Sequence, residues 1–549
     1  MAKKQENQLS YLQMPYPESR SAYRMTKRSW CGLNYKQTVD SGALSMESNI
    51  SSSEAPYLTP SCCRLPYRSG YANPIGLFGF DNFLLVVYRS GSAILIDYIT
   101  EKNGSAQVYT GTIKASGATV KDEFPRCIVQ FNVYDTPTDP VSGQYVKKLL
   151  IFPDKKSMGF TVTQSGFQVK DMSVLVKEYT NDVESEDGTY PPPESASHNY
   201  FYQNLYNQQI YRWVDDESNK DNSGWKVTAA VPAMPDIRYA AVHLSRLFGV
   251  SGDRVYASGY NDYTNWNLDT VEEYNESNAW CSAAQSNTKA DGEFTGITNY
   301  QGHVICFKRD FMHEIYNTKN PFRIQDVYAE GTIDNRTVQD VDGKLIFVSD
   351  DNVKIYTGSN PRVISYYLNL KRYVGAVSGT DGQRYYLYCE DENSDRHLFV
   401  YDTATEYWSE QEITYRVLNF AHNRNGMYAL CGNGVVYKLD TENYNHSWSF
   451  ETDLITNATV DIKHVKKIQM LMEIASGASV KVYALYDDEK FNQSTSHLVY
   501  SDNGKRRKTM RVKLRKTAHY GVKLHVEGYG YVKLYELELL VEAGGESYA

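Results

Sequence analysis

The feature that most constrains the fold is a repeated pairing of short alternating segments between about Tyr71 and Phe450. In NFLLVVYRSGSAILIDYI at 82–99, two apolar segments flank a polar turn whose Gly91 suits the positive φ of a tight hairpin. Similar pairs stand at 127–170, 238–266, 294–324, 345–364, 385–408 and 418–439. Seven units of roughly 30–50 residues have the period of propeller blades. A blade cannot bury both of its faces alone, so we expect the units to stack around an axis.

Composition and the C-terminal pattern support an all-β chain. The sequence holds 47 tyrosines, and bulky aromatic side chains fit a pleated sheet better than a helix. From about 451 onward, segments such as VKKIQMLMEIA at 465–475 alternate strictly, which predicts strands with one buried face. We therefore predict a six- to eight-bladed β-propeller, with seven blades as the best count, over 31–450. A β-sandwich or jelly roll should follow over 451–549.

Two polar stretches interrupt this scheme. Residues 1–30 show neither strand nor helix periodicity and are predicted to form an extended N-terminal arm, either a disordered tail or a tether to a neighbouring subunit. The segment 178–197 combines acidic residues with three consecutive prolines, which cannot donate ladder hydrogen bonds. It is interpreted as an exposed insertion or linker.

Charge and cysteine content narrow the classes of protein. A net charge of −9 argues against generic binding to phosphate backbones or anionic membranes. No apolar run approaches the ~18 residues that a membrane span requires, and the N-terminus lacks the apolar core of a signal peptide. The eight cysteines show no CxxC spacing and are expected to be reduced. These features predict a soluble chain, made in a cytoplasm and without a membrane anchor.

Two clusters are candidate contact sites. The basic cluster consists of Lys505, Arg506, Arg507, Lys508 and Arg511. It is either a solvated charged loop or a docking surface for an acidic partner. The aromatic cluster consists of Tyr200, Tyr202, Tyr206, Tyr211 and Trp213. It could stack on sugar rings, but tyrosine also suits any wet protein interface, which is the favoured interpretation.

Catalytic spacing is mostly missing from the sequence. GxSxG, phosphate-loop and dinucleotide-binding patterns do not occur. HEIYN at 313–317 places Asn317 where a zinc-protease helix needs its second histidine. Asp262 lies four residues after Ser258, whereas the Asp box of sialidase propellers needs two, and the turn aspartates Asp402 and Asp440 are interpreted as structural. We predict no enzyme activity, no metal and no cofactor.

Several longer segments resemble one family of structural proteins from tailed phages and prophages. GLNYKQTVDSGALSMESNISSSEAPYLTP at 32–60 is similar to the start of that family's folded part, and PDIRYAAVHLSRLFGVSGDRVYASGYNDYTNWN at 235–267 resembles one of its blades. VKLHVEGYGYVKLYELELLVEAGG at 522–545 looks like its C-terminal sandwich. The family often has a tryptophan or another aromatic residue where Phe248 stands, and a glycine near Asp351 or Asn352.

The resemblance implies a virion protein of a phage tail, in the nozzle, hub or baseplate of the particle. Such proteins assemble as homo-oligomeric rings, with a hexamer as one candidate state, and anchor adaptor, portal-proximal, spike or fibre proteins. DNA would pass through transiently without specific binding. Assembly would take place in the bacterial host cytoplasm. Two alternatives stay open: a receptor-recognition protein that binds host surface glycans, and a depolymerase or sialidase.

Overall fold

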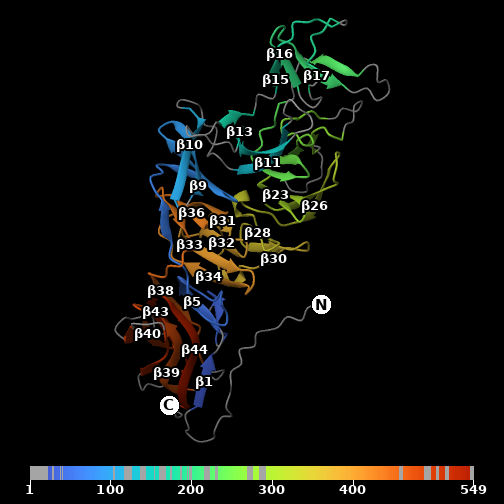
Figure 1. The fold of residues 1–549 in the computed structure, drawn as a ribbon. Coiled ribbons are helices and arrows are strands. Elements are labelled where there is room, and N and C mark those ends of the chain that lie inside the picture. The colour runs from blue at the N-terminus through green and yellow to red at the C-terminus, as the bar shows by residue number, and fades with distance from the viewer. Residues whose placement is uncertain are drawn as a thin grey trace. The chain divides into compact units, whose positions relative to one another are not determined.

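The computed structural model describes all residues except 1–22, 28–29, 37–38, 40, 103–104, 116–126, 136–143, 154, 160–168, 173–175, 186–187, 195, 197–200, 215–222, 229–232, 269–275, 283–291, 457–461, 488–495, 502–505, 514–518 and 544–549. The chain forms two compact units, one of residues 71–338 and one of residues 1–70 together with 339–549. The described residues form strands and two short 3-10 turns, η2 (Asn335–Thr337) and η3 (Tyr366–Leu368), but no α-helix (Figure 1). The predicted all-β class is confirmed.

The unit of residues 71–338 holds four blades, each a four-stranded antiparallel sheet in chain order. Their strands are β7 (Pro74–Phe80), β8 (Phe83–Ser90), β9 (Ala93–Lys102) and β10 (Ser105–Lys114); β11 (Cys127–Asp135), β12 (Gln144–Phe152), β13 (Lys156–Gly159) and β14 (Val169–Asp171); β19 (Tyr239–His243), β20 (Arg246–Ser251), β21 (Arg254–Ala257) and β22 (Trp280–Cys281); and β23 (Gly296–Tyr300), β24 (His303–Phe307), β25 (Met312–Tyr316) and β26 (Arg323–Tyr328).

A fifth sheet in this unit lies between the second and third blades in the sequence, but it does not separate these blades in space. It consists of β15 (Val176–Tyr179), β16 (Phe201–Asn204), β17 (Ile210–Val214) and β18 (Gly224–Thr228). Strand β11 packs directly against β19, and β19 packs against β23. The two blades on either side of the fifth sheet in sequence are therefore neighbours in space. The insertion predicted at 178–197 begins in β15 and, where it is described, continues between the parallel strands β15 and β16.

The other unit holds three more blades. The first two are β27 (Gln339–Val341), β28 (Lys344–Val348), β29 (Val353–Tyr356) and β30 (Arg362–Val363), followed by β31 (Val374–Thr380), β32 (Arg384–Glu390), β33 (Arg396–Asp402) and β34 (Tyr407–Gln411). The third joins β35 (Val417–Asn423), β36 (Gly426–Cys431) and β37 (Val436–Lys438) to the N-terminal strand β6 (Leu65–Arg68). The described residues of the two units thus form seven blades, and the predicted β-propeller class is confirmed.

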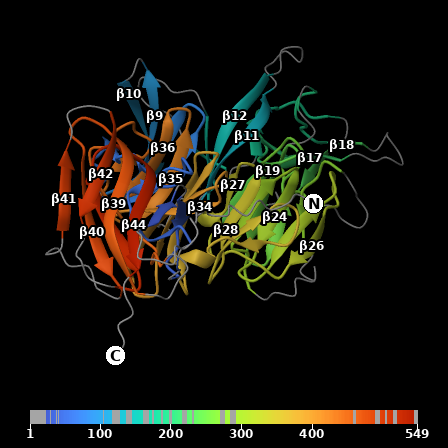
Figure 2. The same ribbon diagram turned by 90° about the horizontal axis from the view of Figure 1, so that it is seen from below.

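The same unit holds the two sheets of the sandwich (Figure 2). One sheet has the order β1 (Tyr23–Lys27), β44 (Val532–Ala543), β39 (Lys463–Ile474) and β42 (Arg506–Lys513). The other has the order β2 (Cys31–Leu33), β3 (Ala43–Ser48), β38 (Ser447–Thr452), β43 (Val522–Tyr529), β40 (Ser479–Tyr486) and β41 (Ser496–Ser501). Two short strands, β4 (Ile50–Ser51) and β5 (Thr59–Pro60), form a separate pair.

These strand pairings place the boundary between propeller and sandwich at other residues than predicted. Residues 31–48, which the sequence pattern assigned to the propeller, supply β2 and β3 of the sandwich. Within the predicted arm, residues 1–22 lie outside the described part of the chain, while Tyr23–Lys27 form an edge strand antiparallel to β44. The N-terminal segment therefore contributes to the sandwich first and then closes the last blade through β6.

Strict alternation explains the core of the sandwich. Along β39, Ile468, Met470 and Met472 point inward and are buried, while Gln469 and Leu471 point to the outer face. This period of two is what a sheet with one buried face requires. The central blade strand β32 differs, because all five residues from Tyr385 to Cys389 are buried between neighbouring elements.

Candidate functional site

The basic cluster lies on the edge strand β42 of the sandwich. Lys505 lies outside the described residues, Arg506 and Lys508 belong to the strand, and the side chains of Arg507 and Arg511 are exposed. Because alternate residues of a strand share a face, Arg507 and Arg511 lie on the same outer surface.

Acidic neighbours already offset part of this charge. Arg507 is paired in register with Glu473 of β39, and its guanidinium lies 4.8 Å from the ring centre of Tyr535 on β44. The hydroxyl of Tyr535 donates to Glu473 Oε2 at 3.2 Å. Glu538, also on β44, accepts a hydrogen bond from Gln469 of β39. The outer face therefore mixes both signs of charge, which weakens the interpretation of β42 as a strongly basic docking surface.

The aromatic cluster belongs to the β15–β18 sheet and is largely internal. Tyr200 lies outside the described residues. Tyr202 and Tyr211 are buried, with Tyr211 fully enclosed, and the rings of Trp213 and Trp225 meet edge to face at 5.4 Å. Of the five predicted contact residues, only Tyr206 is described as largely exposed, at 60%. Tyr202 and Tyr211 pack against Tyr179 and Trp225 inside this sheet, so these two rings are not available to stack on a ligand as predicted.

The turn aspartates and the histidine motif have structural roles. Asp402 Oδ1 accepts from the backbone N–H groups of Ala404 and Thr405, as predicted for a residue that begins a turn. Asp262 Oδ1 accepts from the backbone and the hydroxyl of Thr264. His313 and Glu314 lie on strand β25 and so point to opposite faces, unlike the corresponding residues of a zinc-protease helix.

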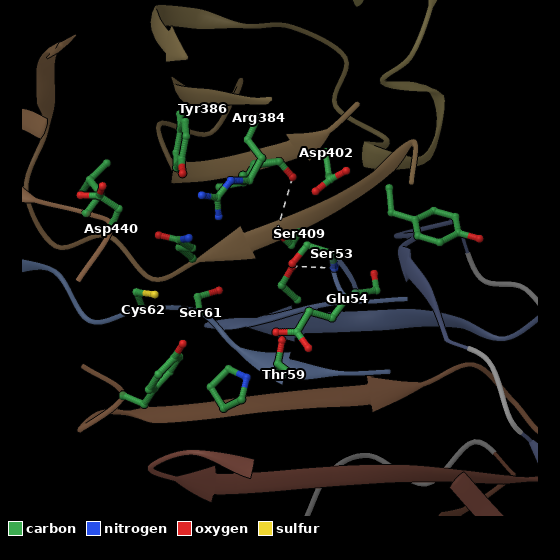
Figure 3. Close-up of a pocket in the computed structure, with 18 of the residues that line it drawn as sticks. Ser53, Glu54, Thr59, Ser61, Cys62, Arg384, Tyr386, Asp402, Ser409 and Asp440 are labelled. Atoms are coloured by element: carbon green, nitrogen blue, oxygen red, sulfur yellow. Dashed lines mark hydrogen bonds between the residues drawn. The ribbon is translucent and has the colours of Figure 1, made fainter. Parts of the chain in front are cut away.

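A cavity of about 180 Å³ lies between the β4–β5 pair and the last two blades (Figure 3). Its wall combines polar groups with apolar ones, among them Pro60, Val400 and Leu439. Figure 3 shows polar side chains from these segments around a common space, among them Glu54, Ser61, Cys62, Arg384, Asp402 and Asp440. No local sequence pattern marks this site, because its wall combines residues more than 300 positions apart.

Arg384 is the cation in this wall, and Asp381 neutralises it. The Nε and Nη2 atoms of Arg384 each lie 2.8 Å from Asp381 Oδ2, which also accepts from the hydroxyl of Tyr386 at 3.1 Å. Burial alone would raise the pKa of Asp381, but the Arg384 charge and the hydrogen bonds lower it. The pair is therefore ionised at neutral pH, and the guanidinium is held in place beside the cavity.

The thiol and the phenol in the wall stay protonated. Burial raises the pKa of Cys62, and burial together with the neighbouring Cys62 raises the pKa of Tyr444 to about 12. A protonated thiol is a poor nucleophile. The arrangement suits hydrogen bonding to a small molecule rather than nucleophilic attack on it.

A second polar cluster links the sandwich to the sixth blade in sequence order. Tyr35 donates its hydroxyl proton to Glu410 Oε2, and Glu410 Oε1 lies 2.8 Å from His397 Nδ1. Glu47 of β3 is buried beside them, and neither of its carboxyl oxygens has a hydrogen-bond partner among the described residues. Burial, and next the charge of Glu410, raise the pKa of Glu47 well above its ordinary value. Glu47 is therefore protonated in the folded protein.

This cluster predicts a decline in stability with rising pH. Above the ordinary glutamate pKa, the unfolded chain has released the Glu47 proton while the folded chain still holds it, so the free energy of unfolding falls by up to about 1.4 kcal/mol per pH unit. The decline ends at the raised pKa of the folded state. His397 adds to it with the same sign: burial alone would lower its pKa, but the hydrogen bond and charge of Glu410 raise it.

Glu47→Gln is expected to remove the glutamate part of this decline. Its stability relative to the natural chain should increase from pH 5 to pH 8, as measured by urea unfolding at a series of pH values. Glu392→Gln, which changes an exposed carboxylate paired with Lys371, serves as the control and should leave the pH profile unchanged. Parallel profiles for the natural chain and Glu47→Gln would contradict the assignment.

Two further features of the structure concern metal ions and membranes. Among the described residues, no group of three or more His, Cys, Asp and Glu side chains is arranged to hold a metal ion. Within the same part of the chain, no helix has the length and apolar character needed to cross a bilayer.

Among the comparisons with known proteins, only the comparison with solved structures finds similarity, and it finds propeller-type structures. No family model matches the sequence, and no curated protein matches it. The WD40 domain of Toxoplasma gondii coronin has 8% identity and a TM-score of 0.34, covering 70% of this chain and 88% of that chain. Trypanosoma rangeli sialidase has 9% identity and a TM-score of 0.27, covering 90% and 96%.

A glycoside hydrolase family 43 arabinoxylan arabinofuranohydrolase from Bacillus subtilis has 7% identity and a TM-score of 0.20, covering 86% of this chain and 96% of that chain. The similar structures thus include enzymes as well as a WD40 domain. At these TM-scores the similarity carries no argument about activity or ligand.

Proposed function

We propose that this chain is a non-enzymatic structural protein of a bacteriophage tail, in the nozzle, hub or baseplate, that assembles into a ring and anchors neighbouring tail proteins. The segments similar to phage structural proteins at 32–60, 235–267 and 522–545 support this role. Their strands fall in the sandwich, in the β4–β5 pair and in one blade. The protein would act mechanically, through rigid sheets that present contact surfaces to its neighbours.

The observation that carries the proposal is the β15–β18 sheet. The blades do not need it for their own packing, because β11 and β19 meet directly. It exposes the large apolar side chains of Leu205 (44%) and Tyr206 (60%) beside each other in the chain, and the ring of Tyr190 lies 5.4 Å from that of Tyr206. An accessory sheet with exposed aromatic and aliphatic groups suits a protein–protein contact.

The test is the assembly state of the purified full chain, measured by mass photometry. We expect a closed oligomer at a multiple of the subunit mass, and we expect Leu205→Ser with Tyr206→Ser to shift it toward the monomer. Leu244→Asn is the matched control, because Leu244 is an exposed leucine at φ 47°, which asparagine tolerates better. The proposal fails if the chain stays monomeric and is absent from purified particles of the phage or prophage that encodes it.

The alternative role in glycan recognition is supported by less of the aromatic cluster than the sequence indicates. Tyr202 and Tyr211 are buried and cannot offer their faces to a sugar. Glycan recognition at the aromatic cluster would have to rely on Tyr206 and its neighbours alone.

A further inference from the structure

We propose that the cavity bounded by Ser61, Arg384 and Asp440 binds a single sugar ring. This inference does not depend on the tail role. It concerns a different surface from the aromatic cluster, and it stands on the chemistry of the wall.

The charges in the wall argue against an inorganic anion or a metal ion as the ligand. Arg384 is the cation of the wall, and its charge is already matched by Asp381 at 2.8 Å. Glu54 is paired with Lys533 Nζ at 2.6 Å, while Asp402, Asp440 and Glu442 add negative charge around the same space. No metal-binding group of three ligands occurs among the described residues. An organic ligand without negative charge therefore fits this wall best.

Both kinds of hydrogen-bonding group are present for such a ligand. The carboxylate of Asp440 can accept from a ligand hydroxyl, and the hydroxyls of Ser61 and Thr59 can donate or accept. Asp440 reaches this position because residue 426 is a glycine: a Cβ there would lie 2.4 Å from both carboxylate oxygens. Sugar hydroxyls also donate and accept, so a polyhydroxyl ring can satisfy both kinds of group at once.

The size of the cavity and the apolar part of its wall narrow the choice of ligand further. About 180 Å³ is less than the ~300–1,000 Å³ of pockets for drug-sized ligands, so there is room for one ring rather than a chain. Pro60, Val400 and Leu439 give the wall its apolar part. A pyranose has the matching combination of polar edge and apolar face.

The experiment is saturation-transfer NMR on the full chain with glucose, galactose, mannose and N-acetylglucosamine as probes. We expect one or more of them to bind with a dissociation constant on the order of 1 mM, as suits a small polar ligand. Asp440→Asn should weaken binding at least about tenfold, because the charged acceptor is replaced by a neutral and weaker amide oxygen. Ser61→Leu should abolish binding by filling the cavity.

Two control measurements test whether the sugar binds in the cavity. Asp342→Asn changes an exposed carboxylate at φ 52°, outside the wall, and should leave the affinity unchanged. A bound sugar should also slow alkylation of Cys62 but not of Cys281, which lies in the other unit. The proposal is overturned if none of the four sugars binds at tens of millimolar, or if Asp440→Asn and Ser61→Leu bind as well as the natural chain.

Discussion

Arg246→Ala is expected to lower the stability of the unit of residues 71–338 by about 3–5 kcal/mol. Arg246 is 2% exposed, and its guanidinium donates to the backbone oxygens of Ser258, Asn278 and Glu276. These hydrogen bonds join both ends of the connection between β21 and β22 to Arg246, the first residue of β20. Removing it leaves three acceptors without their charged donor and opens a void beside Phe322, whose ring centre lies 5.5 Å away.

Thermal and urea unfolding of the purified chain would measure this loss. In a unit of this size, 1 kcal/mol shifts the melting temperature by about 2–4 °C, so the change should be easily seen. Arg246→Lys should recover only part of the stability, because a single ammonium lacks the planar fork that reaches three carbonyls. Arg238→Ala is the control: its ion pair with Glu293 is solvent-exposed at 3.7 Å and should cost under about 1 kcal/mol. Equal effects of Arg246→Ala and Arg238→Ala would contradict the argument.

Trp448→Ala is expected to destabilise the sandwich by about 3–5 kcal/mol. Trp448 is 4% exposed and lies in the core beside Phe450, and its indole N–H donates to the backbone oxygen of Gly530 at 2.9 Å. It faces Gly528 across the β38–β43 pair, where a Cβ would lie 2.0 Å from Trp448 Cζ2. The glycine therefore makes room for the tryptophan.

A double-mutant cycle tests that relation. Gly528→Ala alone should cost about 1–3 kcal/mol by overpacking, but in the Trp448→Ala background it should cost much less, because the clashing ring is gone. The measurement is urea unfolding followed by the fluorescence of the remaining tryptophans and by circular dichroism. Additive effects of the two substitutions would show that Gly528 is not required by Trp448.

The pairs of alternating segments predicted the blades well. Each unit named from the sequence, such as 82–99 or 418–439, contains strands of one blade, because a hairpin depends on residues that are close in the chain. Alternation also predicted the C-terminal sandwich. Pairings between distant segments were missed: β6 joins β37 across some 370 positions, and β2 and β3 join the sheet of β38. Short polar segments can pair with any free edge, so periodicity cannot show which edge they take.

The candidate sites were harder to predict than the strands. The sequence marked Arg507 and Tyr211 by local density of charge and of aromatic rings. The local density of charged or aromatic residues along the sequence does not reveal that Glu473 lies opposite Arg507, or that Tyr211 is enclosed by its own sheet. The cavity and the buried Glu47 carry no local signal at all, because each depends on side chains brought together from distant strands.

The tyrosines separate what sequence and tertiary structure each decide. The sequence by itself determined the all-β class, the blade period and the alternating sandwich strands, because steric fit to a pleated sheet and a period of two act over a few neighbouring residues. Only the tertiary structure decided that Tyr385, Tyr388 and Tyr428 are fully buried in blades while Tyr206 and Tyr366 face outward. Burial depends on which sheets pack together. That choice is set by long-range pairing, which the pattern along the chain does not record.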